Sequence, residues 1–384
     1  MQPAPTPIDA GPRIRASTGT YEFLHNHTVG TYQADALCKG CIVLGFKMSS
    51  GHHANAAVMF DRPIGLPADY DRTIIDFQAC LDLAGPVCGH LKPQTLIRIV
   101  DSAIDLEIEE PDNSGAFFVL PSQLNGAEYP SNLEGDIVTR LADYVHDRTG
   151  GPRGQLAVHP AVGQFLLNNA ANDTNADGLN SVRELLVADA DGELAKHVWL
   201  QNGYLRVSPD APDEIGARYL ANLDKMTYIA ADRVPVDGYY YGREGGSYQR
   251  NGSNFNSEHS EHRVGLIYAS AVPIGCYTNP RRSQALRDIA YYTLVGQYFG
   301  ALSHALNCQL GTQTRVPIML MLLGGGQFRN PLPSIISAIQ CALYLLEIKY
   351  DPIIVGAHLD VCILTYCLST ESEAVYKLLN PKQN

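Results

Sequence analysis

Residues 315–326 read RVPIMLMLLGGG, an apolar run that ends in three glycines. A continuous apolar run of this kind is typical of a parallel strand buried on both faces of its sheet. From Ser334 onward, isoleucines and leucines recur every three or four residues, which predicts an amphipathic helix with Pro333 in its first turn. Residues 352–356 and 359–366 look like two further strands. The order strand, glycine loop, helix, strand predicts a βαβ crossover in a parallel sheet.

The loop of Gly324, Gly325 and Gly326 is suited to hold a phosphate group. Glycine has no Cβ, so backbone N–H groups can approach an anion, and the N-terminus of the following helix favours negative charge. The loop lacks the Gly-Lys-Ser/Thr ending of a P-loop and the G-x-G-x-x-G spacing of a dinucleotide fold, which argues against both of those classes. The alternative is a tight strand-to-helix turn that binds nothing.

A second glycine-rich stretch lies earlier in the chain, between predicted strands at residues 225–231 and 263–268. It contains an aspartate, a Gly-Gly-Ser triplet and an Asn-Ser-Glu triplet. These residues are Asp232, Gly245, Gly246, Ser247, Asn256, Ser257 and Glu258. Two glycine-rich loops in one chain favour a ligand that carries a diphosphate, because each loop can direct N–H groups at one phosphate.

With these two stretches the chain resembles the macrodomain-type poly(ADP-ribose) glycohydrolases, whose signature is three glycines, a short spacer, Gln-Glu-Glu and a Gly-Leu-Tyr segment. Aligning Gly265 with that last segment places Glu258 on the family's catalytic second glutamate and Asn256 on its glutamine. Ser257 stands in place of the first glutamate, and Glu261 becomes the acid if the register slips by one short turn. The residues that resemble the family's diphosphate loop are Gly324, Gly325, Gly326, Gln327, Phe328 and Asn330.

The resemblance covers the C-terminal half and implies both a fold and a ligand. The expected fold class is α/β, with a macrodomain-like three-layer α/β/α sandwich over residues 196–384. A flexible leader at residues 1–15 and a mixed α+β accessory region at 16–195 would precede it. The implied ligand is ADP-ribose, held by Asp232, by the residues Gly245, Gly246, Ser247 and Asn256, and by the second loop.

The resemblance also implies a reaction. Cleavage of a glycosidic bond at the ribose passes through an oxocarbenium-like state, which needs a carboxyl group near the anomeric carbon. Glu258 is the expected catalytic residue, Glu261 is the second candidate, and no cofactor is required for catalysis. The expected function is an ADP-ribosyl hydrolase acting on a modified protein or polymer, with ubiquitin among the candidate proteins. Because Ser257 replaces one of the paired glutamates, a non-catalytic ADP-ribose reader is the alternative.

Residues 173–184 fit the twelve-residue calcium loop of an EF-hand. The oxygen donors would be Asp173, Asn175, Asp177 and Glu184, with a glycine at the sixth position. Against this, the eighth position holds Asn180 where an apolar residue is usual. A turn rich in Asn, Asp and Gly also needs no metal. Residues 173–184 are therefore interpreted either as a site for a structural calcium ion or as a plain turn.

Composition and net charge exclude several classes of function. The chain has 384 residues, 45% of them hydrophobic, and a formal net charge of −12, which argues against nonspecific binding to nucleic acid or to an anionic membrane. No segment reads as a membrane span and residues 1–13 show no signal-peptide pattern. Nine irregularly spaced cysteines favour a reducing compartment, and Cys38 and Cys41 read as buried thiols rather than zinc ligands. The expected location is the cytoplasm, or a host cytoplasm for a delivered effector.

Overall fold

The structure is a computed structural model. It describes residues 42–47, 53–54, 93–128, 144, 147, 149–158, 162–163, 166–167, 178–201, 203–223, 226–236, 239–241, 248–250, 262–275, 283–310, 312, 314–366 and 369–380.

A mixed sheet of eight strands is the central element of the described chain, in the order β2-β1-β7-β10-β4-β11-β12-β3. Its strands are β1 (Ile42–Lys47), β2 (His53–Ala54), β3 (Ile97–Val100), β4 (Phe117–Pro121), β7 (Thr227–Pro235), β10 (Arg263–Ala269), β11 (Val316–Met321) and β12 (Leu359–Leu364). The strands from β10 to β3 run parallel to one another, whereas β7 is antiparallel to both β10 and β1. The parallel half of the sheet therefore has a single carboxyl edge.

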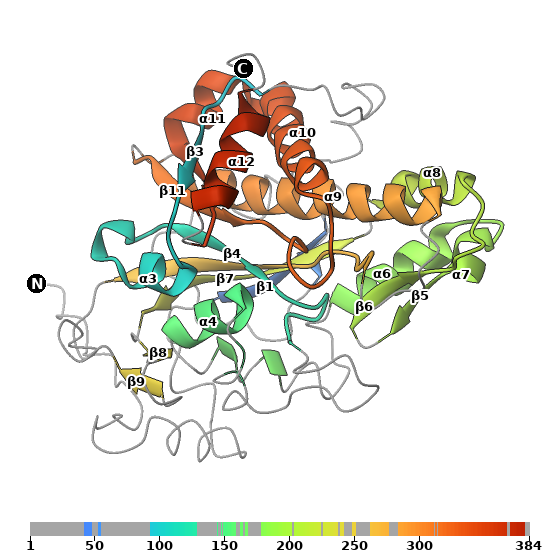
Figure 1. Cartoon of the computed structure of the whole chain (residues 1–384), viewed down its shortest axis with the longest axis horizontal. Coiled ribbons are helices and arrows are strands. Elements are labelled where there is room, and N and C mark those ends of the chain that lie inside the picture. The colour runs from blue at the N-terminus through green and yellow to red at the C-terminus, as the bar shows by residue number, and fades with distance from the viewer. Residues whose placement is uncertain are drawn as a thin grey trace, which may run out of the picture.

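Helices cover both faces of this sheet. The helices are α3 (Ile104–Glu109), α4 (Gly150–Ala157), α6 (Gly178–Ala188), α7 (Glu193–His197), α8 (Glu214–Ala221), α9 (Gln284–Gln309), α10 (Leu332–Tyr350), α11 (Pro352–His358) and α12 (Ser369–Leu379), with a 3₁₀ turn at η3 (Pro111–Asn113). Helices α9 and α10 lie on one side of the sheet, and α3 and α4 lie on the other (Figure 1). The described chain is thus an α/β protein with three layers, as the sequence predicts for its C-terminal half.

Two small antiparallel pairs lie outside the main sheet. They are β5 (Val198–Gln201) with β6 (Tyr204–Val207), and β8 (Tyr239–Tyr241) with β9 (Tyr248–Arg250). The first pair lies beside α6 and α7 at one end of the molecule (Figure 1).

The predicted βαβ crossover is present in β11, α10 and β12, but one of its predicted strands is wrong. Residues 352–358 form helix α11 instead. Asp351 explains this, because its side chain accepts a hydrogen bond from the backbone N–H of Ile353 at 2.8 Å and so caps the first turn. Pro352 at the first helical position has the backbone angle that a helix needs.

The predicted domain boundary at residue 195 does not divide the sheet. Strands β3 and β4 come from the region predicted to be an accessory unit, yet β4 lies between β10 and β11 at the centre of the parallel half, and β3 forms its edge. The accessory region is therefore, in its described part, an integral part of the same sheet. The leader predicted at residues 1–15 lies outside the described residues.

Helix α10 packs as a core element. Among the described helices it is long and apolar enough to cross a membrane by length and composition, which departs from the expectation that no segment is. Its Ile335, Ile339 and Leu346 are completely buried, and it packs against α9. Because a helix inside a large core is apolar on most sides, this composition is explained by burial in the protein.

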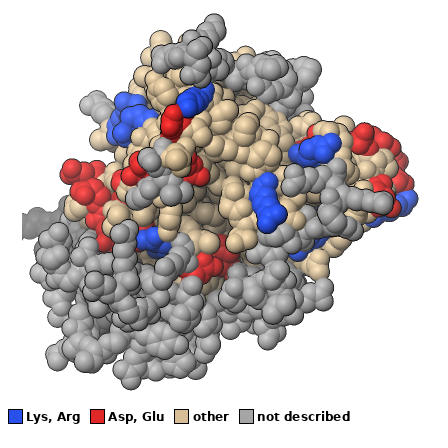
Figure 2. All heavy atoms as spheres, in the orientation of Figure 1, with Lys and Arg blue, Asp and Glu red and all other residues tan. Residues whose placement is uncertain are grey.

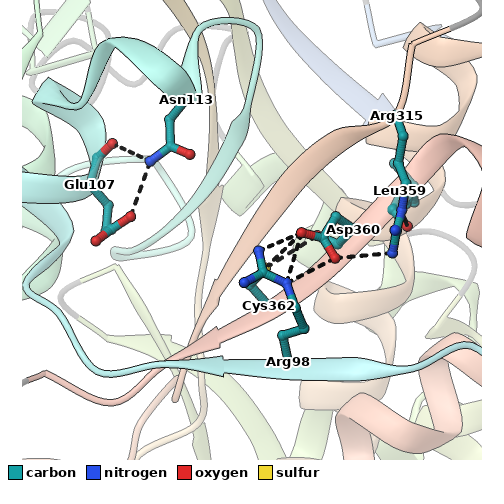
Figure 3. Close-up of polar contacts among 7 residues, drawn as sticks. All are labelled: Arg98, Glu107, Asn113, Arg315, Leu359, Asp360 and Cys362. Atoms are coloured by element: carbon teal, nitrogen blue, oxygen red, sulfur yellow. Dashed lines mark hydrogen bonds and ion pairs between the residues drawn. The ribbon is translucent and has the colours of Figure 1, made fainter.

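An ion-pair network joins β3, β12 and β11 at their amino ends (Figure 3). Arg98 on β3 donates two hydrogen bonds from Nε to the carboxylate of Asp360 on β12, at 3.1 and 2.9 Å. Arg315, just before β11, donates to the same carboxylate at 3.0 Å. Burial alone would raise the pKa of Asp360, but the two arginines outweigh it and hold that pKa below its usual value. One carboxylate thus joins three neighbouring strands.

Candidate ligand site

The carboxyl edge of the parallel strands gathers the loops that follow β3, β4, β10, β11 and β12. Open α/β sheets bind their ligands at this edge, because the loops and the helix N-termini that follow the strands meet there. The glycine loop at residues 322–330 lies at its centre, between β11 and α10. This loop is therefore the centre of the candidate site.

Gly324 is required by the path of the loop. Its φ of 71° lies in the left-handed region that favours glycine. A Cβ on Gly324 would also lie 2.4 Å from Asn330 Nδ2 and 2.8 Å from the Cβ of Ala271. The loop closes on itself here, because the N–H of Asn330 donates to the carbonyl of Gly324 at 3.0 Å. Gly324 and Asn330 thus set the shape of the loop.

Gly325 and Gly326 are exposed, whereas Gly324 is half-buried. The N–H of Gly325 donates within the loop to the carbonyl of Leu322 at 3.0 Å. At Gly326, an added Cβ would meet no atom within 4 Å, so this side of the loop faces open space. Exposed glycine backbone in a loop that leads from a strand into a helix is the arrangement that can accept a phosphate.

The loop after β10 supports the glycine loop from one side. Asn330 donates from Nδ2 to the carbonyl of Val272 at 3.1 Å, and the N–H of Ile274 donates to the carbonyl of Phe328 at 3.0 Å. Asn330 is only 5% exposed, and its amide holds the shape of the loop. Its predicted contact with a ligand stays a prediction.

An aromatic contact links the glycine loop to a carboxylate at the same edge. The ring of Phe328 meets the ring of Tyr204 edge-on, with centroids 5.0 Å apart. The Tyr204 hydroxyl donates to Glu128 Oε2 at 3.5 Å, the far end of hydrogen-bonding distance. Burial raises the pKa of Tyr144 well above its usual value, and the nearby charge of Glu128 raises it further. Glu128 thus lies among two tyrosines in the loop that follows β4.

A second polar cluster lies at the β3 and β12 end of the edge. Arg153 of α4 forms an ion pair with Asp105 at 2.5 Å and a hydrogen bond with the hydroxyl of Tyr366. Its guanidinium also lies 5.4 Å from the centre of the Tyr366 ring. Among the described residues, Asp105 Oδ1 and Arg153 Nε are buried without a hydrogen-bond partner. Buried polar atoms normally have partners, so this cluster has unused capacity for a ligand.

Asp232 does not lie with the glycine loop, although the resemblance implies ADP-ribose binding for it. Its Oδ1 is 2.8 Å from Nε2 of His304 on α9, and both side chains are almost fully buried. Asp232 lies near the pairing of Gly265 with Phe117, at the amino end of β4. The glycine loop lies at the opposite, carboxyl edge. Asp232 is therefore a buried residue at the opposite edge from the glycine loop, and its role in ADP-ribose binding stays a prediction.

The other predicted site residues lie mostly outside the described residues. These are Gly245, Gly246, Ser247, Asn256, Glu258 and Glu261, together with the calcium candidates Asp173, Asn175 and Asp177. The fourth calcium candidate, Glu184, lies on α6, which begins at Gly178. The catalytic and calcium assignments therefore stay predictions.

Glu128, Tyr204, Asp105, Arg153 and Tyr366 are candidate site residues that the sequence reasoning missed. Asp105, Arg153 and Tyr204 lie in the short elements α3, α4 and β6, whereas Glu128 follows β4 and Tyr366 follows β12. They form two clusters that meet the edge because β3, β4 and β12 end there. One usable signal was Asn125-Gly126 after the apolar run of β4, because such a pair marks a sharp turn directly after a strand.

Charged residues are interspersed on the face shown in Figure 2, where acidic and basic side chains alternate in the described part. Acidic side chains gather at the end of the molecule that carries α7 and α8 (Figures 1 and 2). This distribution gives no extended basic surface on the described part of that face, in keeping with the net charge of −12.

The fold and this edge define an α/β protein with a candidate anion-binding loop. Neither a protein-family model nor a curated protein matches the chain. Among solved structures, the chain is similar to a macrodomain of Trypanosoma brucei, with 13% sequence identity and a TM-score of 0.30 over 98% of this chain and 100% of that chain. At this identity and TM-score, the similarity does not assign the chain to a family.

Proposed function

We propose that this protein binds ADP-ribose at the carboxyl edge of its sheet, with the diphosphate on the loop of Gly324, Gly325 and Gly326. The observation that carries the proposal is the exposed glycine backbone at Gly325 and Gly326, held in place between β11 and α10. The N–H of Gly325 already donates to Leu322, so the exposed backbone at Gly326 is the part of the loop that would meet a negatively charged group, without a lysine or a metal ion.

The layout of the edge suggests how the ligand lies. Asp105 and Tyr366 flank the loop on the β3 and β12 side, where an unpartnered carboxylate oxygen and an aromatic ring suit an adenine amine and its ring. Glu128 and Tyr204 flank it on the β4 side. We therefore place the adenine toward Asp105 and the second ribose toward Glu128, with the diphosphate between them.

The finer proposal is hydrolysis of the bond between ADP-ribose and a modified protein or polymer. Glu258 remains the proposed catalytic residue and Glu261 the second candidate, on the resemblance to the macrodomain-type glycohydrolases. Glu128 is proposed to accept a hydrogen bond from a ribose hydroxyl, because its carboxylate lies beside Tyr204, whose ring contacts Phe328 of the glycine loop. This separates a group that acts on the breaking bond from a group that orients the sugar.

A non-catalytic ADP-ribose reader is the alternative, favoured by Ser257 in place of the family's first glutamate. Ubiquitin as the modified protein, a cytoplasmic location and a structural calcium ion at residues 173–184 also stay proposals. Release of ADP-ribose from an ADP-ribosylated protein, measured beside direct ADP-ribose binding, tests the function. Binding with release supports the hydrolase, binding without release supports the reader, and no binding by the folded protein contradicts both.

A further inference from the structure

Three metal-binding side chains lie together at the amino end of the sheet, away from the glycine loop. His304 Nε2 is 2.8 Å from Asp232 Oδ1 and 3.8 Å from Cys308 Sγ. The three donor atoms all lie within 4.8 Å of one another. Asp232 and His304 are 3% and 2% exposed, whereas Cys308 is half-buried, so the cluster is reached from the Cys308 side.

The chain builds this cluster from two facing elements. His304 and Cys308 are four residues apart on α9, so their side chains share one face of the helix. Asp232 comes from β7, at a bulge where the pairing with β10 shifts and Arg233 has a φ of 56°. A bulge redirects the side chains of its strand, which accounts for a buried carboxylate beside the apolar segment of β7. The edge of the Phe117 ring packs on the His304 imidazole, with centroids 5.8 Å apart.

The donor set and its spacing fit zinc. Zinc binds imidazole nitrogen, thiolate sulfur and carboxylate oxygen at about 2.0–2.3 Å, so donors around a tetrahedral ion lie about 3.3–3.6 Å apart. The 2.8 Å contact would widen by about half an ångström and the 3.8 Å contact would shorten slightly, within the range that side-chain rotation covers. A hard ion such as magnesium would instead take oxygen donors only.

We propose that Asp232, His304 and Cys308 form a zinc site that fastens β7 to α9. Zinc would replace the hydrogen that His304 and Asp232 share, and the thiol of Cys308 would give up its proton to the solvent on binding. The remaining coordination position would take a water molecule or a further donor. The site lies at the edge opposite the proposed ADP-ribose loop, so its role is structural and is independent of the proposed function.

The alternative is a metal-free buried pair between Asp232 and His304. Burial alone would lower the pKa of His304, but the neighbouring Asp232 and Cys308 raise it. The net effect raises the pKa of His304 to about 10. Such a pair would satisfy both groups without any ion. Zinc binding requires the thiol of Cys308, whereas the metal-free pair between Asp232 and His304 does not.

Metal content of the full-length protein tests the proposal. We expect about one equivalent of zinc per chain after purification in zinc-containing medium and gel filtration. Cobalt added to metal-depleted protein should give a thiolate-to-cobalt absorption band. The matched variants are Cys308→Ala and Cys341→Ala, because Cys341 is a buried cysteine on α10. Cys308→Ala should lose the band and about tenfold or more of the zinc affinity, while Cys341→Ala keeps both.

Circular dichroism on each variant establishes that it is folded, and His304→Gln serves as the second test if Cys308→Ala does not fold. Retention of no zinc by the wild-type protein, with an unchanged melting temperature in added zinc, would overturn the proposal. Persistence of the cobalt–thiolate band in Cys308→Ala would overturn it as well, because the metal would then be bound by other cysteines.

Discussion

The Tyr204 ring meets the Phe328 ring edge-on, with centroids 5.0 Å apart, and so connects the β5–β6 hairpin to the glycine loop. The hairpin and β11 both lie in the region 196–384 that the sequence assigns to one domain, but they are far apart in the chain. Contacts of this kind hold the loop at residues 322–330 in one position before any ligand arrives. A preformed loop loses less conformational freedom on binding.

Replacing Tyr204 therefore tests whether this contact positions the loop. Tyr204→Ala should weaken ADP-ribose binding about threefold to tenfold, because an aromatic pair contributes about 0.5–1.5 kcal/mol. Tyr204→Phe keeps the ring and removes the hydroxyl that donates the long hydrogen bond to Glu128, so its affinity should stay near that of the wild type. Calorimetric titration with ADP-ribose measures both, and equal affinities for all three proteins would contradict a positioning role.

The Asp360 network predicts a loss of stability in acid. The folded-state pKa of Asp360 is depressed, so its contribution is present above the unfolded-state pKa of about 3.8 and is lost as pH falls through the lower folded value. Asp360→Asn should lower stability at neutral pH by about 1 kcal/mol or less, because both arginines are half exposed. The variant should also show a shallower loss of melting temperature below pH 4.

The control for Asp360→Asn is Glu373→Gln, which removes an exposed ion pair with Lys377 on α12. This substitution should change the melting temperature little at any pH, because exposed pairs contribute little. Identical acid profiles for Asp360→Asn and the wild type would show that the three-strand network does not stabilise the fold.

The hydrolase proposal predicts different kinetic effects for two glutamates. Glu258→Gln should lower kcat about a hundredfold or more and leave ADP-ribose affinity largely intact, because general acid–base assistance acts as the bond breaks. Glu128→Gln should mainly raise KM, because its carboxylate is proposed to bind a ribose hydroxyl in both ground and transition states. Steady-state rates on ADP-ribosylated protein measure both variants, with Glu261→Gln as the register control.

Near-normal turnover by Glu258→Gln would remove that residue from the chemistry. A collapse of kcat in Glu128→Gln with KM unchanged would instead give the catalytic role to the carboxylate beside Tyr204. Both substitutions conserve side-chain size, so their effects on kcat and KM report on the loss of each carboxylate's charge.

The calcium proposal at residues 173–184 predicts a change in melting temperature. Calcium that binds Asp173, Asn175, Asp177 and Glu184 in the folded state should raise the melting temperature, because such a ligand shifts the folding equilibrium by mass action. Asp173→Asn should remove the increase. Equal melting curves in excess calcium and in chelator would favour a plain turn.

The local order of the C-terminal half could be predicted from sequence, because it rests on patterns within short windows. The apolar run of β11, the break at Gly324 and the spacing of α10 each determine their own element. The prediction of a strand at residues 352–356 was wrong. A Pro-Ile-Ile-Val run is typical of a strand, and only the cap by Asp351 shows that a helix begins there.

The partners of each strand could not be predicted, because pairing depends on residues far apart in the chain. Phe117 pairs with Gly265 in β10 and with Ile318 in β11. No local pattern contains that information, so β4 was assigned to an accessory region. For the same reason Glu128 and Arg153 could not be predicted as neighbours of the loop, and no local pattern shows that the Asp232 carboxylate bonds His304.

The most direct test of the account is ADP-ribose binding by Gly326→Val, measured by calorimetry against the wild type. An added side chain at Gly326 meets no atom within 4 Å, so the fold should tolerate it while the branched side chain blocks the approach of the diphosphate. Gly356→Val on α11 is the matched control, since that glycine is equally uncrowded. The account predicts binding by the wild type and Gly356→Val, and a loss of about tenfold or more in Gly326→Val. Absence of binding by the folded wild type, or unchanged binding by Gly326→Val, would contradict it.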